Sequence, residues 1–286
     1  MSWVEHAIWW HIYPLGLCGA PIREPNTAPG PRLRRLLGWL DYAVELGCSG
    51  LLLGPIFTSQ SHGYDSLDLF HIDPRLGDEA DFAELVSQCR KRGLRILLDG
   101  VFSHVGAKHP DVQHALVQGP DSATGKLFDI DWQHPDAPTP RVFEGHSSLV
   151  RLNHSGQEAV DLVVRVMSHW LERGIDGWRL DAAYSVPPEF WSKVVKRVRP
   201  RHPNAWLLGE VLHGDYCAFV AESGIDSVTQ YELWKAIWSS INDRNLFELD
   251  HALGRHNQFL GSFIPNTFVG NHDVTRIASR VGTDGT

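Results

Sequence analysis

Several protein classes are excluded by what this sequence has little of. It carries 26 Lys and Arg residues against 34 Asp and Glu, and the net charge of −8 gives no support for binding nucleic acid or an anionic membrane surface. No apolar run approaches the roughly 20 residues that a membrane-spanning helix needs. Residues 1–6 show no basic stretch that leads into an apolar one, so no signal peptide is expected.

Cysteine is scarce and scattered. The four cysteines show no Cys-x-x-Cys spacing; they are Cys18, Cys48, Cys89 and Cys217. Such isolated thiols are typical of a reducing compartment and not of a disulfide framework or a zinc site. We therefore expect a cytoplasmic protein with no metal held by cysteine.

Aromatic and histidine residues, in contrast, are plentiful. The chain of 286 residues has 16 His, 11 Trp, 12 Phe and 6 Tyr, and 43% of its residues are hydrophobic. That length and composition suit one large globular domain or two small ones. Flat amphipathic rings often fill a core, but a surplus of them also suits stacking on the faces of sugars.

Short apolar runs alternate with stretches of helical periodicity along the whole chain. Strands are predicted at residues 7–13, 50–53, 95–98, 175–181, 205–208, 225–229 and 267–270. Helices are predicted at residues 33–46, 79–92, 157–173, 187–198, 231–241 and 246–260, and another is expected before the chain stops at residue 286. Fully apolar strands that alternate with helices predict a parallel sheet covered by helices.

Chemically reactive side chains follow at least four of these strands. They are Asp99 and His104, Arg179 and Asp181, Glu210, and His272 and Asp273. A doubly wound sheet places its ligand at one switch point, whereas a barrel gathers groups from many strand ends on one face. We therefore predict an α/β fold, a (β/α)8 TIM-type barrel that lacks the eighth strand, as one incomplete catalytic domain over residues 1–286. Residues 105–150 are too long for an ordinary connection and predict a small inserted subdomain after strand three.

The order of residues in the fourth predicted strand suggests a catalytic pair. Side chains alternate between the faces of a strand, so Arg179 and Asp181 share one face. A guanidinium beside a carboxylate keeps it ionised, as a nucleophile requires, although a purely structural pair is the alternative. Glu210 follows an apolar run and is expected in drier surroundings, where it keeps a proton. One charged and one protonated carboxyl are the arrangement of glycoside hydrolysis.

Four segments, in order, resemble the sequence regions of the α-amylase family (glycoside hydrolase family 13). They are residues 99–104, 177–181, 209–211 and 268–273. Residues 149–153 resemble a further region of neopullulanases and cyclomaltodextrinases, and His213 and residues 190–191 point weakly to the same branch. The similarity covers essentially the whole chain.

This resemblance implies a retaining enzyme that acts on α-glucosidic bonds of an α-glucan or malto-oligosaccharide. It implies that Asp181 is the nucleophile, that Glu210 is the general acid and then the base, and that Asp273 binds the 2- and 3-hydroxyls of the sugar. It also implies five substrate-binding residues: Tyr64 as a stacking aromatic, Asp99 and Arg179 around the nucleophile, and His104 and His272 as hydrogen-bonding partners of the sugar.

No metal or other cofactor is predicted, but calcium stays open. Ser103 occupies the position where many relatives have an asparagine that binds calcium, and a hydroxyl is a weak substitute for an amide carbonyl. Five aspartates of the insertion could serve as ligands or could simply be solvated: Asp111, Asp121, Asp129, Asp131 and Asp136. Zinc at His104 is disfavoured because no second histidine or carboxylate lies beside it at ligand spacing.

Two other functions stay open at the level of the sequence. A glucosyl-transferring or isomerising relative, such as an amylosucrase or a trehalose synthase, would use the same catalytic groups. A non-catalytic glucan-binding fragment is the second alternative, although Asp181, Glu210 and Asp273 are all present. Neither the oligomeric state nor the preferred length of the glucan follows from the sequence.

Overall fold

The computed structural model describes residues 3–22, 28–134 and 137–285. Asp136 and the first two residues of the N-terminal stretch therefore lie outside the described residues. The chain divides into two compact units. Unit 1 comprises residues 1–181 and 193–206, and unit 2 comprises residues 182–192 and 207–286.

Unit 1 is built on four parallel strands that neighbour one another in the order β1 (Trp9–Ile12), β2 (Gly50–Leu53), β3 (Arg95–Gly100) and β9 (Gly177–Leu180). Every residue of β2 and of β9 is buried. A strand such as β2, which is apolar along its whole length, needs cover on both of its faces, and the helices that alternate with the strands provide such cover. The register of β3 and β9 places Asp99 directly opposite Arg179.

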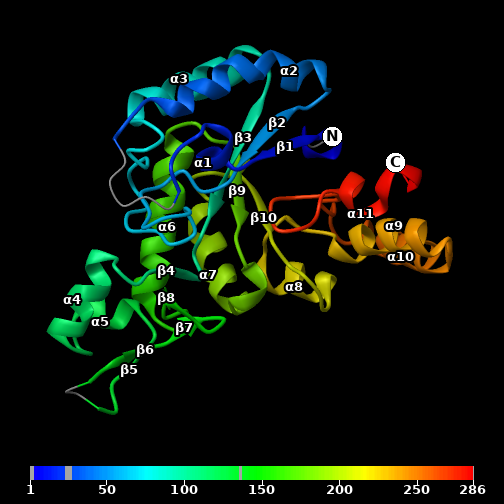
Figure 1. The fold of residues 1–286 in the computed structure, drawn as a ribbon. Helices are drawn as coiled ribbons and strands as arrows, with labels where there is room; N and C mark the ends of the chain where they lie inside the picture. Colours follow the sequence, from blue (N-terminus) through cyan, green and yellow to red (C-terminus); the bar gives the residue numbers. More distant parts are fainter. Residues whose placement is uncertain (1–2, 23–27, 135–136, 286) are drawn as a thin grey trace. The chain divides into compact units, whose positions relative to one another are not determined.

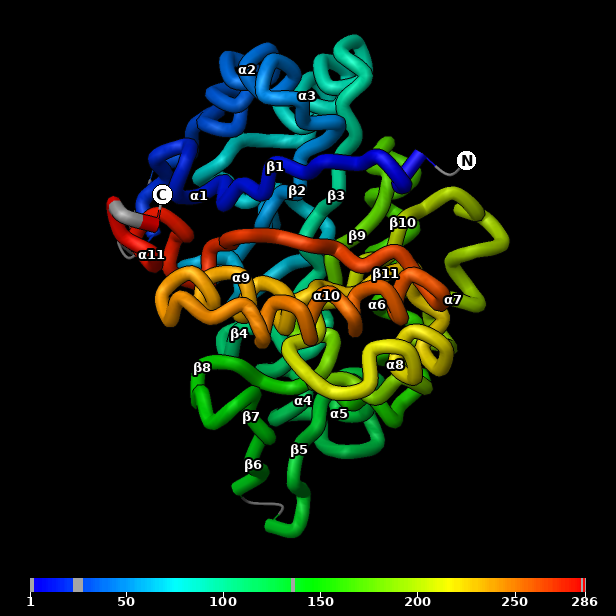
Figure 2. The backbone as a smooth tube through the Cα atoms, turned by 90° about the vertical axis from the view of Figure 1, so that its right-hand side faces the viewer, coloured from blue at the N-terminus to red at the C-terminus, as the bar shows by residue number. Residues whose placement is uncertain are grey.

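The three helices predicted in unit 1 are present. Residues 33–46 form η2 (Arg32–Trp39) and α2 (Leu40–Glu45), and the other two are α3 (Glu79–Lys91) and α6 (Gln157–Glu172). Two short helices, η1 (Trp3–His6) and α1 (Pro14–Leu17), were not predicted. Figures 1 and 2 show α2 and α3 next to each other beside β2 and β3. The helix expected over residues 33–46 begins as a 3-10 helix, in which the buried Leu33 and Leu36 lie three residues apart, or one turn.

An aromatic core connects α6 to the sheet of unit 1. The ring of Trp170 on α6 lies 5.0 Å from that of Phe57, which in turn lies 6.1 Å from that of Trp178 on β9. Trp170 and Trp178 are both fully buried. Because Trp178 faces this core, alternation along the strand directs Arg179 and Asp181 to the opposite face of the sheet.

The segment that follows β3 forms small structures of its own, two helices and short antiparallel strands. These are β4 (His104–Gly106), α4 (Pro110–Gln118), α5 (Ala123–Leu127), β5 (Ile130–Asp131), β6 (Thr139–Pro140), β7 (Val142–Phe143) and β8 (His146–Arg151). Strand β8 pairs with both β4 and β7. The two helices were not predicted, since they are short; each begins at a side-chain cap, His109 for α4 and Ser122 for α5.

Unit 2 contains the second group of parallel strands and their helices. Its elements are η3 (Ala183–Ser185), the part of β10 (Trp206–Gly209) after Trp206, α8 (Tyr216–Ser223), β11 (Ser227–Val228), α9 (Tyr231–Asp243), α10 (Phe247–Phe259) and α11 (Ile277–Gly285). Helix α7 (Pro188–Val198) crosses the boundary between the units. Figure 2 shows α9 and α10 running side by side, where Leu233, Ala236 and Ala252 form a small core.

One prediction for unit 2 was wrong, and one helix was not predicted. Residues 267–270 do not form a strand, and the described residues there show one parallel bridge, between Thr229 and Asn266. Helix α8 was missed because its polar and apolar residues lack a clear period, although Asp215 caps its N-terminus by accepting from Ala218 N.

The fold class is nevertheless confirmed. Parallel strands alternate with helices in both units, and six strands of the parallel kind occur in the described residues where seven were predicted. This is the architecture of a (β/α)8 barrel that is incomplete. Within the described ranges, every helix is too short or too polar to cross a lipid bilayer.

Candidate active site

Arg179 joins two carboxylates at the ends of neighbouring strands in unit 1. Its Nη1 donates to both oxygens of Asp99 at 2.7 Å and to Oδ1 of Asp181 at 3.2 Å. The side chains of Arg179 and Asp99 are 2% and 0% exposed, and that of Asp181 is 12% exposed. The parallel register explains the contact with Asp99, and the two-residue spacing explains the contact with Asp181.

Tyr64 completes this cluster from the loop after β2. Its hydroxyl donates to Oδ2 of Asp99 at 3.1 Å. Asp99 therefore receives donors from both Arg179 and Tyr64, and is held in one orientation beside the arginine. Because the arginine is itself shared by two carboxylates, the cluster carries one net negative charge when both are ionised.

His104 lies in the same unit but has both ring nitrogens bonded to the chain. Its Nε2 lies 2.9 Å from the carbonyl oxygen of Tyr64, and its Nδ1 lies 2.7 Å from Oγ of Ser103. A carbonyl only accepts, so Nε2 carries the proton, Nδ1 accepts, and the Ser103 hydroxyl donates. Burial lowers the pKa of His104 from 6.5 to about 4, so the ring is neutral at neutral pH. A sugar oxygen that accepts from Nε2 would share this N–H donor with the carbonyl oxygen of Tyr64.

The surroundings of Ser103 do not fit calcium. The Ser103 hydroxyl is buried and donates to His104, and it would supply only one of the about six to eight oxygen ligands that calcium takes. Among the described residues, no group of three or more His, Cys, Asp or Glu side chains is arranged to hold a metal ion.

Glu210 lies at the end of β10 in unit 2 and is 6% exposed. Its Oε1 accepts from the hydroxyl of Tyr231 at 3.0 Å, and its Oε2 accepts from the backbone N of Ala182 at 3.0 Å. Ala182 itself adopts a left-handed conformation with φ of 44°, which residues other than glycine rarely take. Gly209, the residue before Glu210, packs closely against the side chain of Ile225. Only glycine fits there, because a Cβ at this position would lie 2.6 Å from Cδ1 of Ile225.

His272 and Asp273 lie near the C-terminal end of unit 2. Nε2 of His272 lies 3.3 Å from Oδ2 of Asp273, and the Asp273 side chain is 53% exposed. Asn271 shapes this turn, since its Oδ1 accepts from the backbone N of Asp273 at 2.9 Å. Its Nδ2 also donates to the hydroxyl of Tyr231 at 2.8 Å, which connects the turn to Glu210.

The eight residues predicted from the sequence thus divide into two groups, one in each unit. Unit 1 brings together Tyr64, Asp99, His104, Arg179 and Asp181, whereas unit 2 carries Glu210, His272 and Asp273.

Two residues near these groups were missed. Tyr231 follows β11 by three residues, and Phe143 stacks on the His104 ring with centroids 4.4 Å apart. The position of Tyr231 after a strand could have suggested it, but nothing in the sequence pointed to Phe143.

Comparisons with known proteins identify the family of the chain. A family model described as the alpha-amylase catalytic domain matches residues 33–286. The chain is 30% identical over 308 aligned residues to a cyclomaltodextrinase of Geobacillus thermopakistaniensis, and this alignment covers 99% of the chain and 52% of that protein. It is 33% identical over 228 residues to an intracellular maltogenic amylase of Bacillus subtilis, which covers 74% of the chain and 39% of that protein.

Solved structures show the same likeness. The cyclic alpha-maltosyl-(1→6)-maltose hydrolase of Arthrobacter globiformis matches with a TM-score of 0.83 and 26% identity, over 98% of this chain and 69% of that one. A cyclomaltodextrinase matches with a TM-score of 0.82 and 27% identity, over 99% and 53%. The chain spans about half the length of the curated relatives it matches over nearly its whole length. On the strength of the family match over most of its residues, the chain belongs to the alpha-amylase catalytic-domain family.

Proposed function

We propose that this chain carries the catalytic machinery of a glycoside hydrolase that cleaves α-1,4-glucosidic bonds in malto-oligosaccharides or related α-glucans, with retention of configuration. The observation that carries the proposal is the contact of Arg179 with both Asp99 and Asp181. A positive charge at this distance favours the ionised form of Asp181, which a carboxylate nucleophile requires. The names of the relatives, a cyclomaltodextrinase and a maltogenic amylase, support the substrate class.

In the first step, Asp181 attacks the anomeric carbon while Glu210 gives its proton to the leaving glycosidic oxygen. The result is a glycosyl ester on Asp181 and a free sugar hydroxyl. The hydroxyl of Tyr231 and the N–H of Ala182 then stabilise the Glu210 carboxylate, since each donates to one of its oxygens. When Glu210 is protonated on Oε1, rotation of the Tyr231 hydroxyl lets it accept this proton's hydrogen bond.

In the second step, the Glu210 carboxylate takes a proton from water, and the water oxygen attacks the anomeric carbon and releases Asp181. Two displacements at one carbon preserve its configuration, and retaining enzymes hold the two carboxyl groups about 5–5.5 Å apart. Asp273 would bind the 2- and 3-hydroxyls of the sugar. Tyr64, Asp99, His104 and His272 would complete the sugar site.

The central test is the replacement Asp181→Asn. An amide cannot form the glycosyl ester, so we expect kcat on maltotriose to fall by about 10³-fold or more, with little change in thermal unfolding. The matched control is Asp41→Asn, because Asp41 is also an aspartate paired with an arginine, Arg92, but its side chain is 74% exposed. Unchanged activity in Asp181→Asn would refute the proposed nucleophile.

Product analysis distinguishes the alternative reactions. A hydrolase converts maltotriose to maltose and glucose, whereas a transferring or isomerising enzyme yields longer or isomeric sugars. NMR of the first products tests retention, since a retaining enzyme releases the α-anomer before it mutarotates. A β-anomer as the first product would contradict the double displacement.

Three wider assignments complete the proposal. Residues 1–286 would form an incomplete catalytic barrel domain with an inserted subdomain at about residues 105–150. An α-glucan or malto-oligosaccharide would be the binding partner, as maltose is in the Arthrobacter globiformis hydrolase. A cytoplasmic location is supported by the name of the intracellular maltogenic amylase and by the four free cysteines.

A further inference from the structure

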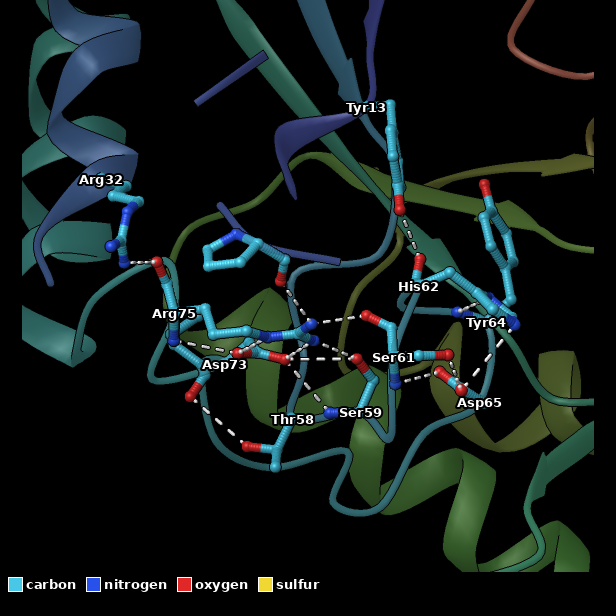
Figure 3. A network of polar contacts seen from close by, with 12 residues as sticks. Tyr13, Arg32, Thr58, Ser59, Ser61, His62, Tyr64, Asp65, Asp73 and Arg75 are labelled. Atoms are coloured by element: carbon cyan, nitrogen blue, oxygen red, sulfur yellow. Dashed lines mark hydrogen bonds and ion pairs between the residues drawn. The ribbon is translucent and has the colours of Figure 1, made fainter. Parts of the chain in front are cut away.

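A buried arginine lies at the base of the loop that carries Tyr64 (Figure 3). Arg75 is 8% exposed, and its partner Asp73 is 2% exposed. Nε of Arg75 donates to Oδ1 of Asp73 at 2.8 Å, and Nη2 donates to Oδ2 at 2.5 Å. This two-pronged pairing neutralises both charges, so the guanidinium is buried without an uncompensated charge.

The remaining donors of Arg75 bind two residues of the loop that carries Tyr64, Ser59 and Ser61, and one residue of the segment after α1, Pro21. Nη1 donates to the carbonyl oxygens of Ser61 at 2.5 Å and Pro21 at 3.1 Å, and Nη2 donates to Oγ of Ser59 at 2.7 Å. With the two bonds to Asp73, these contacts use all five N–H groups of the guanidinium. Lysine offers three donors from a single nitrogen, so it cannot reproduce the set.

Further contacts transmit this anchoring along the loop toward Tyr64. The backbone N of Ser59 donates to Asp73 at 3.2 Å. The backbone N and hydroxyl of Ser61 donate to Asp65 at 3.1 and 2.5 Å, which closes the turn between residues 61 and 65. The hydroxyl of Tyr13 donates to the carbonyl of His62 at 2.8 Å. The backbone on the N-terminal side of Tyr64 is therefore held by the buried Asp65 and Asp73 and by the partly buried Tyr13.

Tyr64 extends from the loop away from Arg75, as Figure 3 shows. Its hydroxyl reaches Asp99 at 3.1 Å, so the loop determines whether Asp99 keeps this donor. We propose that Arg75 is a positioning residue, which holds the loop over residues 59–65 so that Tyr64 meets Asp99 and the sugar. The effect on catalysis rests on the proposed function, whereas the effect on the loop does not.

A double-mutant cycle tests whether Arg75 acts through Tyr64. Misplacement of a site group by about 1 Å costs about 10²-fold, so we expect Arg75→Ala to lower kcat/KM on maltotriose about 10–100-fold. In a Tyr64→Ala background, the same replacement should cause a clearly smaller loss of kcat/KM, because the Tyr64 side chain is already absent and only the contact of the residue 64 carbonyl with His104 remains to be disturbed. Arg75→Ala and Tyr64→Ala should also divide their effects between kcat and KM in the same way. Arg75→Lys should show a smaller loss.

The control is Arg92→Ala. Arg92 is a second arginine of unit 1 with a two-pronged aspartate contact, but this contact is to the exposed Asp41. Its removal should leave kcat/KM unchanged in both backgrounds. Assays at least 10 degrees below the lowest melting temperature of the set keep all variants folded.

Hydrogen exchange tests the loop independently of activity. In Arg75→Ala, peptides over residues 58–66 should exchange at least about tenfold faster, while peptides over strand β3 keep their rates. If Arg75→Ala does not fold, Arg75→Lys serves in both measurements. Equal losses of kcat/KM in the two backgrounds, or unchanged exchange in the loop, would overturn the positioning role. An unaltered chain without glycosidase activity would instead overturn the proposed function, and the exchange data would still decide the role of Arg75.

Discussion

The neutral, buried His104 should make the folded state sensitive to mild acid. Burial lowers its pKa from 6.5 to about 4, whereas the unfolded chain keeps the ordinary value. Between these two values the unfolded state binds a proton that the folded state does not. As far as His104 is concerned, the free energy of unfolding is therefore highest above about pH 6.5 and falls as the pH is lowered toward 4.

The size of the effect follows from the two values. The difference between the two pKa values lowers the free energy of unfolding by about 3 kcal/mol once the pH is at or below 4. At pH 5 the decrease is about 2 kcal/mol. The free energy of unfolding is measured by urea titration, followed by tryptophan fluorescence, at several pH values from 7 to 5. His104→Gln removes the titrating group but keeps a polar side chain.

We expect the wild-type chain to lose about 2 kcal/mol more than His104→Gln between pH 7 and pH 5. Burial also lowers the pKa values of His109 and His154, but these residues are present in both proteins and cancel in the comparison. His114→Gln is the control, because the His114 side chain is 62% exposed. If His104→Gln loses stability as steeply as the wild-type chain, burial of a neutral His104 is not the source of the acid sensitivity.

Two further replacements test the surroundings of the site. Tyr231→Phe removes the hydroxyl that donates to Oε1 of Glu210. A hydrogen bond to a charged group contributes about 1.5–3 kcal/mol, so kcat should fall at least about tenfold, while KM stays within about threefold. Steady-state kinetics check this, with the half-exposed Tyr42→Phe as the control; an unchanged kcat would contradict the role of Tyr231. Gly63→Ala should destabilise the chain by about 1 kcal/mol or more, since φ is +96° and the new Cβ would lie 3.1 Å from Cβ of Pro55. Urea titration measures this, and an equal or higher stability would show that the turn adapts to a side chain.

Much of the fold could be predicted from local pattern alone. The run at residues 50–53 is apolar throughout, and strand β2 occupies those residues with every one of them buried. Helix α3 begins at residue 79, as predicted, where Asp78 and Asp81 form a capping box. Such features depend on neighbours within a few positions, so the sequence carries them directly. Residues 267–270 show where local pattern fails. Their apolar pattern resembles a strand, but whether they pair with another strand depends on residues far away in the sequence.

The candidate site divides in the same way. The sequence by itself determined that Arg179 and Asp181 share a face, because alternation along a strand is local. It did not show that Arg179 binds Asp99 at shorter distances than Asp181, since that contact depends on the register of β3 against β9. Register is a property of two segments about 80 residues apart, and no periodicity within either one specifies it.

Only the tertiary structure decided which groups surround the predicted residues. Both nitrogens of His104 are occupied, Tyr231 donates to Glu210, and Arg75 anchors the loop of Tyr64. Each of these contacts joins a side chain to atoms whose position depends on packing of several elements. The sequence determined which chemical groups this protein has and at which strand ends they lie. The packing of the strands and loops determined their partners, because hydrogen bonds and burial act between neighbours in space, whatever their separation along the chain.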